Sequence, residues 1–218
     1  MGLALVLTGC AGLRDGLARP RAPMVDQDIR AKAYSHYLAA VVYEQQGRFE
    51  EAVGELRQAS DLDPAALSIH TKLAHVYLYL REYDNALVAY KRALECRPQD
   101  VSLWMLVGEI NRRLERYDEA SEAFQQALSL DPNTPTAYEA LLQIEETTND
   151  LVAVIETYEE LLRLHPNAPQ LRLQLAINYA RIGDSESTIR ELKQALALDP
   201  SMEQPLLLLG IAYMELND

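Results

Sequence analysis

The stretch LWMLVGEINRRLERYDEASEAFQQALSLDP (residues 103–132) decides the fold of this chain. In its first half Trp104 and Val107 lie one helical turn apart, and in its second half Ala120 and Ala127 lie two turns apart. Such spacings place each pair on one face of a helix. A short charged segment separates the two halves. The stretch therefore predicts two amphipathic helices joined by a turn.

The same features recur along the chain with a period of 34 residues. A proline removes a backbone N–H donor and disfavours helical geometry in the residue before it, so a periodic proline marks a periodic turn. The prolines of this series are Pro64, Pro98, Pro132, Pro166 and Pro200. A second turn lies inside each unit, where Gly47, Asn149 and Gly183 tolerate a left-handed helix end.

Small residues recur with the same period and indicate how the helices pack. Two helix axes approach closely only where no long side chain separates them. One series is Ala52, Ala86, Ala120, Val154 and Thr188, and another is Ala59, Ala93, Ala127, Leu161 and Ala195. A third series carries tyrosine at Tyr43, Tyr77, Tyr179 and Tyr213, with Asn111 and Glu145 between them.

This 34-residue unit, with its alanines, tyrosine and terminal proline, resembles the tetratricopeptide repeat (TPR). The resemblance covers residues 31–218 and implies an all-α fold, a right-handed α-α superhelix of about five full repeats and a partial sixth. The full repeats are 33–66, 67–100, 101–134, 135–168 and 169–202, and the partial repeat is 203–218.

The fourth repeat departs most from the pattern. Glu145 stands in the tyrosine series, and Val154 and Leu161 stand where other units have alanine. Larger side chains hold helix axes apart. We therefore expect the two helices of this unit to be more widely spaced, with a local change of superhelical curvature at 145–161.

The chain ends on an apolar segment, PLLLLGIAYMELND (residues 205–218). Repeat arrays need a polar terminal cap, because each unit buries its apolar face only against a neighbour. The segment predicts either that the natural chain continues or that this helix is itself a cap with an apolar outer face.

The charge of the chain narrows the class of partner. A formal net charge of −13, with no cluster of Lys or Arg, repels the phosphates of nucleic acids. No apolar run approaches the roughly 20 residues that span a bilayer. We therefore expect no nucleic-acid partner and no membrane-spanning helix.

The stretch Leu7-Thr8-Gly9-Cys10 resembles the lipobox of bacterial lipoproteins. The resemblance implies a signal peptide at 1–9, a lipidated cysteine at Cys10 and a tether over 10–30. It further implies an envelope protein, and Ala11 directly after the cysteine implies the periplasmic face of the outer membrane. The apolar run is short and no Lys or Arg precedes Cys10, so the alternative is an extra apolar turn packed on the first repeat.

No catalytic or metal-binding constellation is found. His70 and His75 point to different helix faces, and His36 and His70 share the repeat position of Trp104, which indicates packing residues. No phosphate loop, nucleophile elbow or Cys-x-x-Cys motif occurs. The chain is therefore expected to be no enzyme and to take no cofactor, metal or small-molecule substrate.

Tetratricopeptide arrays bind with an inner groove formed mainly by the first helix of each unit. By repeat position the groove residues are Tyr34, Tyr37, Val41, Ser68, Thr71, His75, Tyr79, Met105, Glu109, Arg112, Arg113, Glu139, Gln143, Leu173, Ile177 and Arg181. Arg112 and Arg113 can pair either with a partner's carboxylate or, within the chain, with Glu109 or Glu115. The clamp by which one subfamily grips a C-terminal carboxylate is not matched, because Lys72 is the only basic residue at its positions.

The resulting hypothesis is a non-catalytic scaffold, lipid-anchored in a bacterial envelope, that binds a peptide or helix of a protein partner. Two alternatives stay open. One is the recognition arm of a longer chain with a catalytic domain beyond Asp218, and the other is a cytosolic adaptor in which Cys10 is unmodified.

Overall fold

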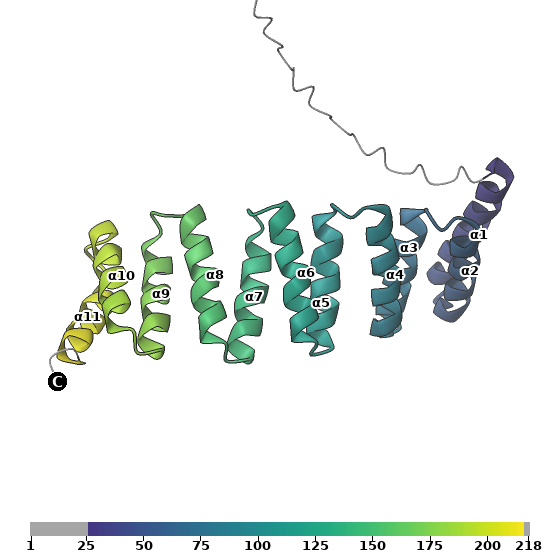
Figure 1. Ribbon diagram of the computed structural model, residues 1–218. Helices are drawn as coiled ribbons and strands as arrows, with labels where there is room; N and C mark the ends of the chain where they lie inside the picture. Colours follow the sequence, from purple (N-terminus) through teal and green to yellow (C-terminus); the bar gives the residue numbers. More distant parts are fainter. Residues whose placement is uncertain (1–25, 216–218) are drawn as a thin grey trace, which may run out of the picture.

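The computed structural model describes residues 26–215, which form eleven α-helices (Figure 1). In chain order they are α1 (Gln27–Gln45), α2 (Phe49–Leu62), α3 (Leu67–Tyr79), α4 (Tyr83–Cys96), α5 (Val101–Arg113), α6 (Tyr117–Leu130), α7 (Pro135–Thr147), α8 (Leu151–Leu164), α9 (Pro169–Arg181), α10 (Ser185–Leu198) and α11 (Glu203–Glu215). Each repeat supplies one odd-numbered and one even-numbered helix. The predicted all-α helix-turn-helix array is confirmed.

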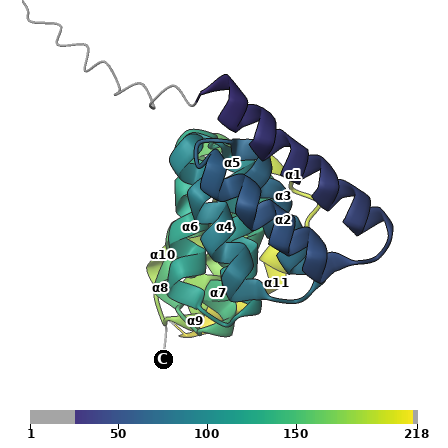
Figure 2. The ribbon, with the colours of Figure 1, turned by 90° about the vertical axis from the view of Figure 1, so that its right-hand side faces the viewer.

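The helices pack one after another along the array. Viewed from the end that carries α1, helix α1 lies in front, and α6, α8 and α10 lie to one side of it (Figure 2). Contacts between elements run almost entirely from each helix to the next along the chain. We call the outer surface of the odd-numbered helices the odd face and that of the even-numbered helices the even face.

The turn inside each unit is left-handed at one residue. The backbone angle φ is positive at Gly47 (74°), Arg81 (59°), Glu115 (58°), Asn149 (56°) and Gly183 (81°), one residue per repeat. The prediction from Gly47, Asn149 and Gly183 is confirmed. Arg81 and Glu115 adopt the same conformation despite their β-carbons, which costs about 1 to 2 kcal/mol each.

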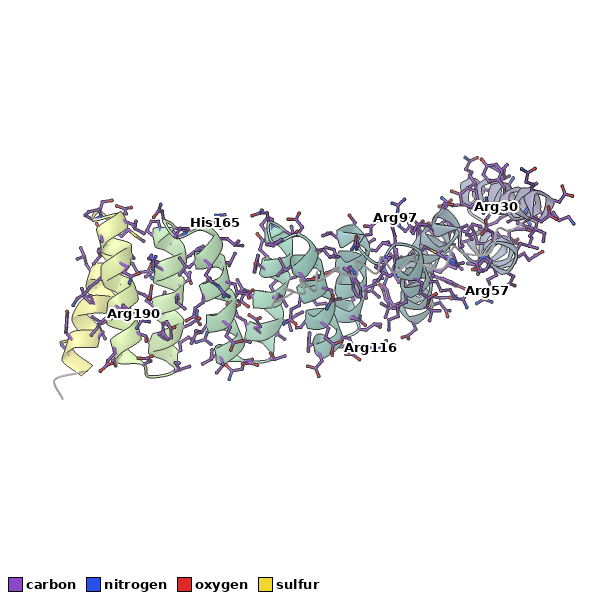
Figure 3. All side chains as sticks on the ribbon, turned by 45° about the horizontal axis from the view of Figure 1, so that its top comes forward. Arg30, Arg57, Arg97, Arg116, His165 and Arg190 are labelled. Atoms are coloured by element: carbon purple, nitrogen blue, oxygen red, sulfur yellow. The ribbon has the colours of Figure 1, made fainter. Side chains whose placement is uncertain are left out.

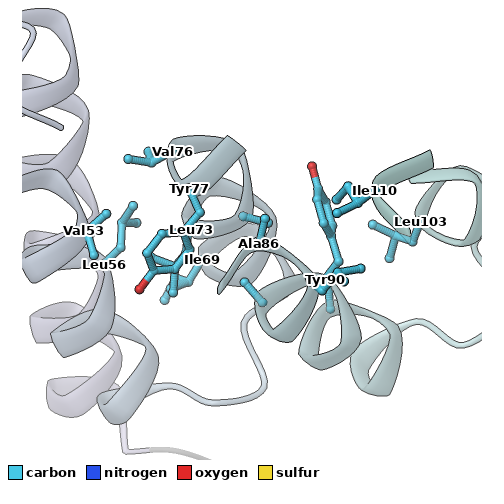
Figure 4. Packing of buried hydrophobic residues seen from close by; sticks show 14 of the residues in the cluster. Val53, Leu56, Ile69, Leu73, Val76, Tyr77, Ala86, Tyr90, Leu103 and Ile110 are labelled. Atoms are coloured by element: carbon cyan, nitrogen blue, oxygen red, sulfur yellow. The ribbon is translucent and has the colours of Figure 1, made fainter. Parts of the chain in front are cut away.

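The buried apolar side chains form four successive clusters along the array. Figure 4 shows part of the first cluster, from Leu56 of α2 through Tyr77 of α3 and Tyr90 of α4 to Ile110 of α5. The alanines of the two small-residue series are all fully buried: Ala52, Ala59, Ala86, Ala93, Ala120, Ala127 and Ala195. Short side chains here let neighbouring helix axes approach.

One repeat position ties the second, third and fifth units to the proline turn before each of them. The side chains of His70, Trp104 and Arg172 stand at this position, and each donates a hydrogen bond to the carbonyl oxygen of the proline six residues earlier. The distances from nitrogen to oxygen are 2.8, 2.9 and 2.9 Å. At the same position in the first unit, His36 donates through Nδ1 to Glu55 at 2.6 Å. His70 is fully buried, as expected of a packing residue, whereas His36 is half-buried and paired with Glu55.

The fourth unit is looser than the others. Helices α7 and α8 pack against each other much less closely than the two helices of any other full repeat. Val154 is fully buried between them, and Leu142 occupies a position where the other full repeats have alanine or glycine. The predicted wider spacing is confirmed, and the change of curvature at 145–161 stays a prediction.

The two ends of the described array add to what the sequence predicts. Helix α1 begins at Gln27, earlier than the expected start of the repeat domain at residue 31, because the Asp26 carboxylate accepts a hydrogen bond from the backbone N–H of Asp28 (3.1 Å) and caps the helix. Cys10, the signal segment 1–9 and most of the tether lie outside the described residues. At the other end, α11 leaves Leu207 and Met214 largely exposed.

Candidate functional site

The odd face carries hollows between successive odd-numbered helices. Cavities of about 350 Å³ between α1 and α3, about 390 Å³ between α5 and α7, and about 330 Å³ between α9 and α11 follow one another along it. Seven predicted groove residues line them: Tyr34, Tyr37 and Ser68 in the first, Arg112 and Gln143 in the second, and Ile177 and Arg181 in the third.

The remaining predicted groove residues lie outside these hollows. His75, Tyr79, Arg113 and Glu139 are exposed, and Val41, Thr71, Met105 and Glu109 are half-buried.

Leu173 is a correction, because it is only 2% exposed and cannot line a groove. It packs with Ala176 and Leu192, and Leu208 and Leu209 from the next unit lie against this cluster. The neighbouring unit therefore covers an apolar side chain whose repeat position alone predicts exposure.

Exposed tyrosines give the first part of the odd face an aromatic surface. The rings of Tyr34 and Tyr37 stack with centroids 6.1 Å apart, and those of Phe49 and Tyr79 stack at 3.8 Å. Tyr34 is 61% exposed and Tyr79 is 68% exposed. Large amphipathic rings with few rotatable bonds are favourable contact groups for a peptide.

The basic centre of the odd face is largely neutralised within the chain. Arg112 donates to both oxygens of Glu109, at 2.9 and 3.0 Å, and Arg113 donates to one of them at 3.1 Å. Burial raises the pKa of Glu109, but the two arginines outweigh burial and hold that pKa below its ordinary value. Of the pairings expected for Arg112 and Arg113, the structure therefore shows the one with Glu109. The Glu109–Arg112–Arg113 cluster carries one net positive charge.

Other basic side chains are dispersed and paired. The labelled arginines of Figure 3 are spread along the array from Arg30 near one end to Arg190 near the other. Lys72, at the carboxylate-clamp position, forms a salt bridge with Glu44, and Arg116 pairs with Asp84 at 2.8 Å. The described residues therefore present no basic patch of the kind that nucleic acids require.

Residues 26–215 contain no cluster of three or more His, Cys, Asp or Glu side chains arranged to hold a metal ion. No helix in this range has the length and apolar character to cross a membrane.

Comparison with protein families identifies the array. Residues 80–206, more than half of the chain, match the family described as the cytochrome c-type biogenesis protein H TPR domain. The chain belongs to this family. Residues 40–80 match a second family, described as TPR repeat. No curated protein matches the chain.

Solved structures share the fold of this TPR domain at low sequence identity. A crystal structure of MamA protein has a TM-score of 0.54 at 18% identity, covering 78% of this chain and 92% of that one. A structure of YrrB, described as a TPR protein with an unusual peptide-binding site, has a TM-score of 0.52 at 19% identity, covering 80% and 90%. A structure of Naa15/Naa10 bound to HypK-THB has a TM-score of 0.61 at 18% identity, covering 85% of this chain and 29% of that one.

A further cavity, of about 470 Å³, lies on the even face of the TPR domain between α6 and α8, with α7 behind it. Figure 1 shows α7 between these two helices. Glu145 of α7 lines the cavity and is 8% exposed. From the sequence, Glu145 was expected only to contribute to the wider spacing of the fourth unit. Its place in the tyrosine series, together with Leu142 in a series of small residues, was the available signal for a cavity.

Glu145 is held in an unfavourable setting for a charged group. Burial raises the pKa of its carboxyl group; a hydrogen bond from Thr157 lowers it, and the charges of Asp150, Glu156 and Glu146 raise it further. The Thr157 hydroxyl donates to Oε1 at 2.8 Å. The folded protein therefore binds a proton at Glu145 more tightly than the unfolded chain does.

The Glu145→Gln variant should be more stable than the wild type at neutral pH. A carboxyl group whose pKa is raised by folding adds stability below its unfolded pKa, and this stability is lost as the pH rises through the folded pKa. The difference should be about 1 kcal/mol, or about 2 to 4 °C in Tm, and should shrink as the pH falls through the folded pKa and vanish below the ordinary carboxyl pKa of 4.5. Circular dichroism melts of both proteins from acid to neutral pH measure it. A Tm difference that does not change with pH would contradict this cause.

Proposed function

We propose that this protein is a non-catalytic scaffold that binds a peptide or helix of a protein partner along its odd face. The observation that carries the proposal is the succession of hollows between the odd-numbered helices, lined by residues expected in a groove on repeat position alone. Exposed tyrosines supply contact area, and the Glu109–Arg112–Arg113 cluster supplies one net positive charge. The TPR family match supports protein or peptide recognition.

The proposal places the scaffold in a bacterial envelope, anchored by lipid on Cys10 and facing the periplasm from the outer membrane. Its support is the resemblance of Leu7-Thr8-Gly9-Cys10 to a lipobox, with Ala11 after the cysteine. Two or more fatty chains anchor a protein stably, since each buried methylene contributes about 0.8 kcal/mol.

The family name supports a pathway for the scaffold. A domain of the cytochrome c-type biogenesis protein H family is expected to act on a protein of cytochrome c maturation. Deleting the gene in its host should lower the content of c-type cytochromes, measured by haem staining of denaturing gels. A normal content would remove the pathway from the proposal and leave the scaffold.

Photocrosslinking tests which face binds. A benzoylphenylalanine placed at Ser68 or at Gln143, on the odd face, should crosslink to one shared partner that mass spectrometry identifies. The same group at exposed Lys91 or Gln58, on even-numbered helices, serves as the control. Equal crosslinking from both faces, or different partners from the two odd-face positions, would contradict a groove.

Replacing both Arg112 and Arg113 with alanine should weaken capture of that crosslinked partner about tenfold while changing Tm little, because hydrogen bonds to charged groups contribute about 1.5 to 3 kcal/mol and exposed ion pairs contribute little to folding. Arg92→Ala, an exposed arginine on α4, is the matched control. Pull-down with purified partner measures the effect. Unchanged binding in the double variant would take these arginines out of the site.

The Cys10→Ser variant tests the anchor. Wild-type protein expressed in a Gram-negative host should incorporate labelled palmitate and sediment with membranes, and the variant should lose both properties together. An unlabelled and soluble wild type would move the search for partners to the cytoplasm.

A further inference from the structure

The cavity between α6 and α8 contains Glu145 at a repeat position where the second and fifth units have a tyrosine. Tyr77 of α3 accepts a hydrogen bond from Nε of Arg57 on the preceding even-numbered helix, at 2.8 Å. Tyr179 of α9 donates to Glu159 on the preceding even-numbered helix, at 2.6 Å. Glu145 occupies the repeat position of these tyrosines and is shorter.

The helix spacing keeps the cavity open. The even-numbered helix before Glu145 carries Gln125 at the repeat position of Arg57, and Gln125 lines the cavity. Val154 and Leu161 of α8, larger than the alanines of other units, hold α7 and α8 apart. The cavity is therefore formed by residues of the third and fourth units acting together.

The polar groups that line the cavity include a carboxylate, that of Glu145, with which no basic side chain of the lining pairs. Glu145 accepts from Thr157 through Oε1, but its buried Oε2 has no hydrogen-bond partner among the described residues. Arg163, the basic residue of the lining, pairs with Glu160 at 3.1 Å. Glu156 and Glu160 bring the carboxylates of the lining to three. The cavity is thus acidic, and its least exposed carboxyl group points into it.

We propose that this cavity binds a guanidinium or primary ammonium group carried on an aliphatic stem, with the Glu145 carboxylate as its anionic partner. Burying a carboxylate is costly unless it is paired and hydrogen-bonded, and such a cation supplies both charge and N–H donors to Oε2. Leu128 and Leu164 in the lining provide apolar contact for the stem. The volume lies in the range of small-ligand pockets.

The cation can come from an arginine or lysine side chain of a partner protein or from a free alkylamine or alkylguanidine. Both sources share the chemistry that Glu145 recognises. The site lies on the even face, so its failure would leave the proposed scaffold on the odd face untouched.

Titration with two matched pairs of probes tests the site. One pair is butylguanidine and its uncharged analogue butylurea, and the other is the amide of acetyl-Gly-Arg-Gly and the same peptide with citrulline in place of arginine. Binding is followed through the backbone amide resonance of Thr157 in ¹⁵N-labelled protein and by calorimetry. Stronger binding of the arginine peptide than of butylguanidine assigns the cation to a partner protein, and the reverse assigns it to a small molecule.

The cationic probes should bind saturably and the uncharged ones should not. Glu145→Gln keeps the size of the side chain and should weaken binding about tenfold or more, because the ion pair is lost. Glu145→Tyr should fold, since the second and fifth units carry tyrosine at this position, and should abolish binding by filling the cavity.

Glu119→Gln, an exposed change on α6 away from the cavity, should bind as the wild type does. Equal binding of charged and uncharged probes would overturn the proposal. Undiminished binding by Glu145→Gln, or no saturable binding by the wild type up to the solubility limit of both cationic probes, would overturn it as well.

Discussion

Gly108→Ala should destabilise the array by about 1 to 3 kcal/mol, because an added β-carbon meets a buried ring. A β-carbon at Gly108 would lie 2.7 Å from Cε1 and 2.8 Å from Cζ of Phe124. Phe124 is 1% exposed and packed on all sides, so its ring cannot move away without shifting its neighbours. Urea titration followed by circular dichroism measures the loss.

The array itself suggests the rescue. The first and fifth units carry Ala40 with Leu56 and Ala176 with Leu192 at the positions of Gly108 and Phe124, and all four side chains are fully buried. The double variant Gly108→Ala with Phe124→Leu should therefore recover most of the stability that Gly108→Ala loses. A double-mutant cycle with additive losses would show that the clash is not the cause.

Glu191→Ala should cost about 3 kcal/mol, because it leaves a mostly buried arginine without its counter-charge. Arg172 donates to Glu191 at 2.9 Å, and the two side chains are 18% and 8% exposed. Arg190 also pairs with Glu191, at 3.1 Å, but is about half exposed and can turn to solvent. The loss should appear as a lower urea midpoint, with faster hydrogen exchange in α9 and α10.

The side chains at the same two positions of the third unit suggest a variant that compensates for the loss of Glu191. At the positions of Arg172 and Glu191 the third unit has Trp104 and Ala123, and Trp104 donates to the carbonyl of Pro98 at 2.9 Å as Arg172 does to that of Pro166. Arg172→Trp combined with Glu191→Ala should restore most of the stability, because no unpaired charge is left buried. Glu186→Gln, an exposed carboxylate of α10, is the control and should change the midpoint little. A double variant no better than Glu191→Ala would contradict the exchange.

Both predictions exploit the way in which a repeat array distributes its interactions. Each unit contacts only its neighbours. A side-chain pair that packs well in one unit should therefore also pack well at the same two positions of another unit. The fourth unit shows the limit of this equivalence, because Glu145 and Leu142 change the spacing of its helices and open a cavity.

The sequence by itself determined the helix-turn-helix array, its turns and the wider spacing of the fourth unit. These features depend on the period of prolines, on small residues at helix contacts and on residues that tolerate a left-handed turn, all of which act locally or between adjacent helices. The odd-face residues followed from the same period, because helical spacing fixes the direction in which each side chain leaves its helix.

Only the tertiary structure decided what covers a position and what pairs with it. Leu173 points as the groove residues do but is buried by the next unit. Arg112 and Arg113 share Glu109 rather than Glu115, because the bidentate geometry to Glu109 is within reach on the same helix face. Glu145 became an unpaired carboxyl in a cavity because α6, α7 and α8 together set its surroundings. Whether a side chain is buried or paired depends on all the residues around it. Its repeat position specifies only where that side chain itself lies.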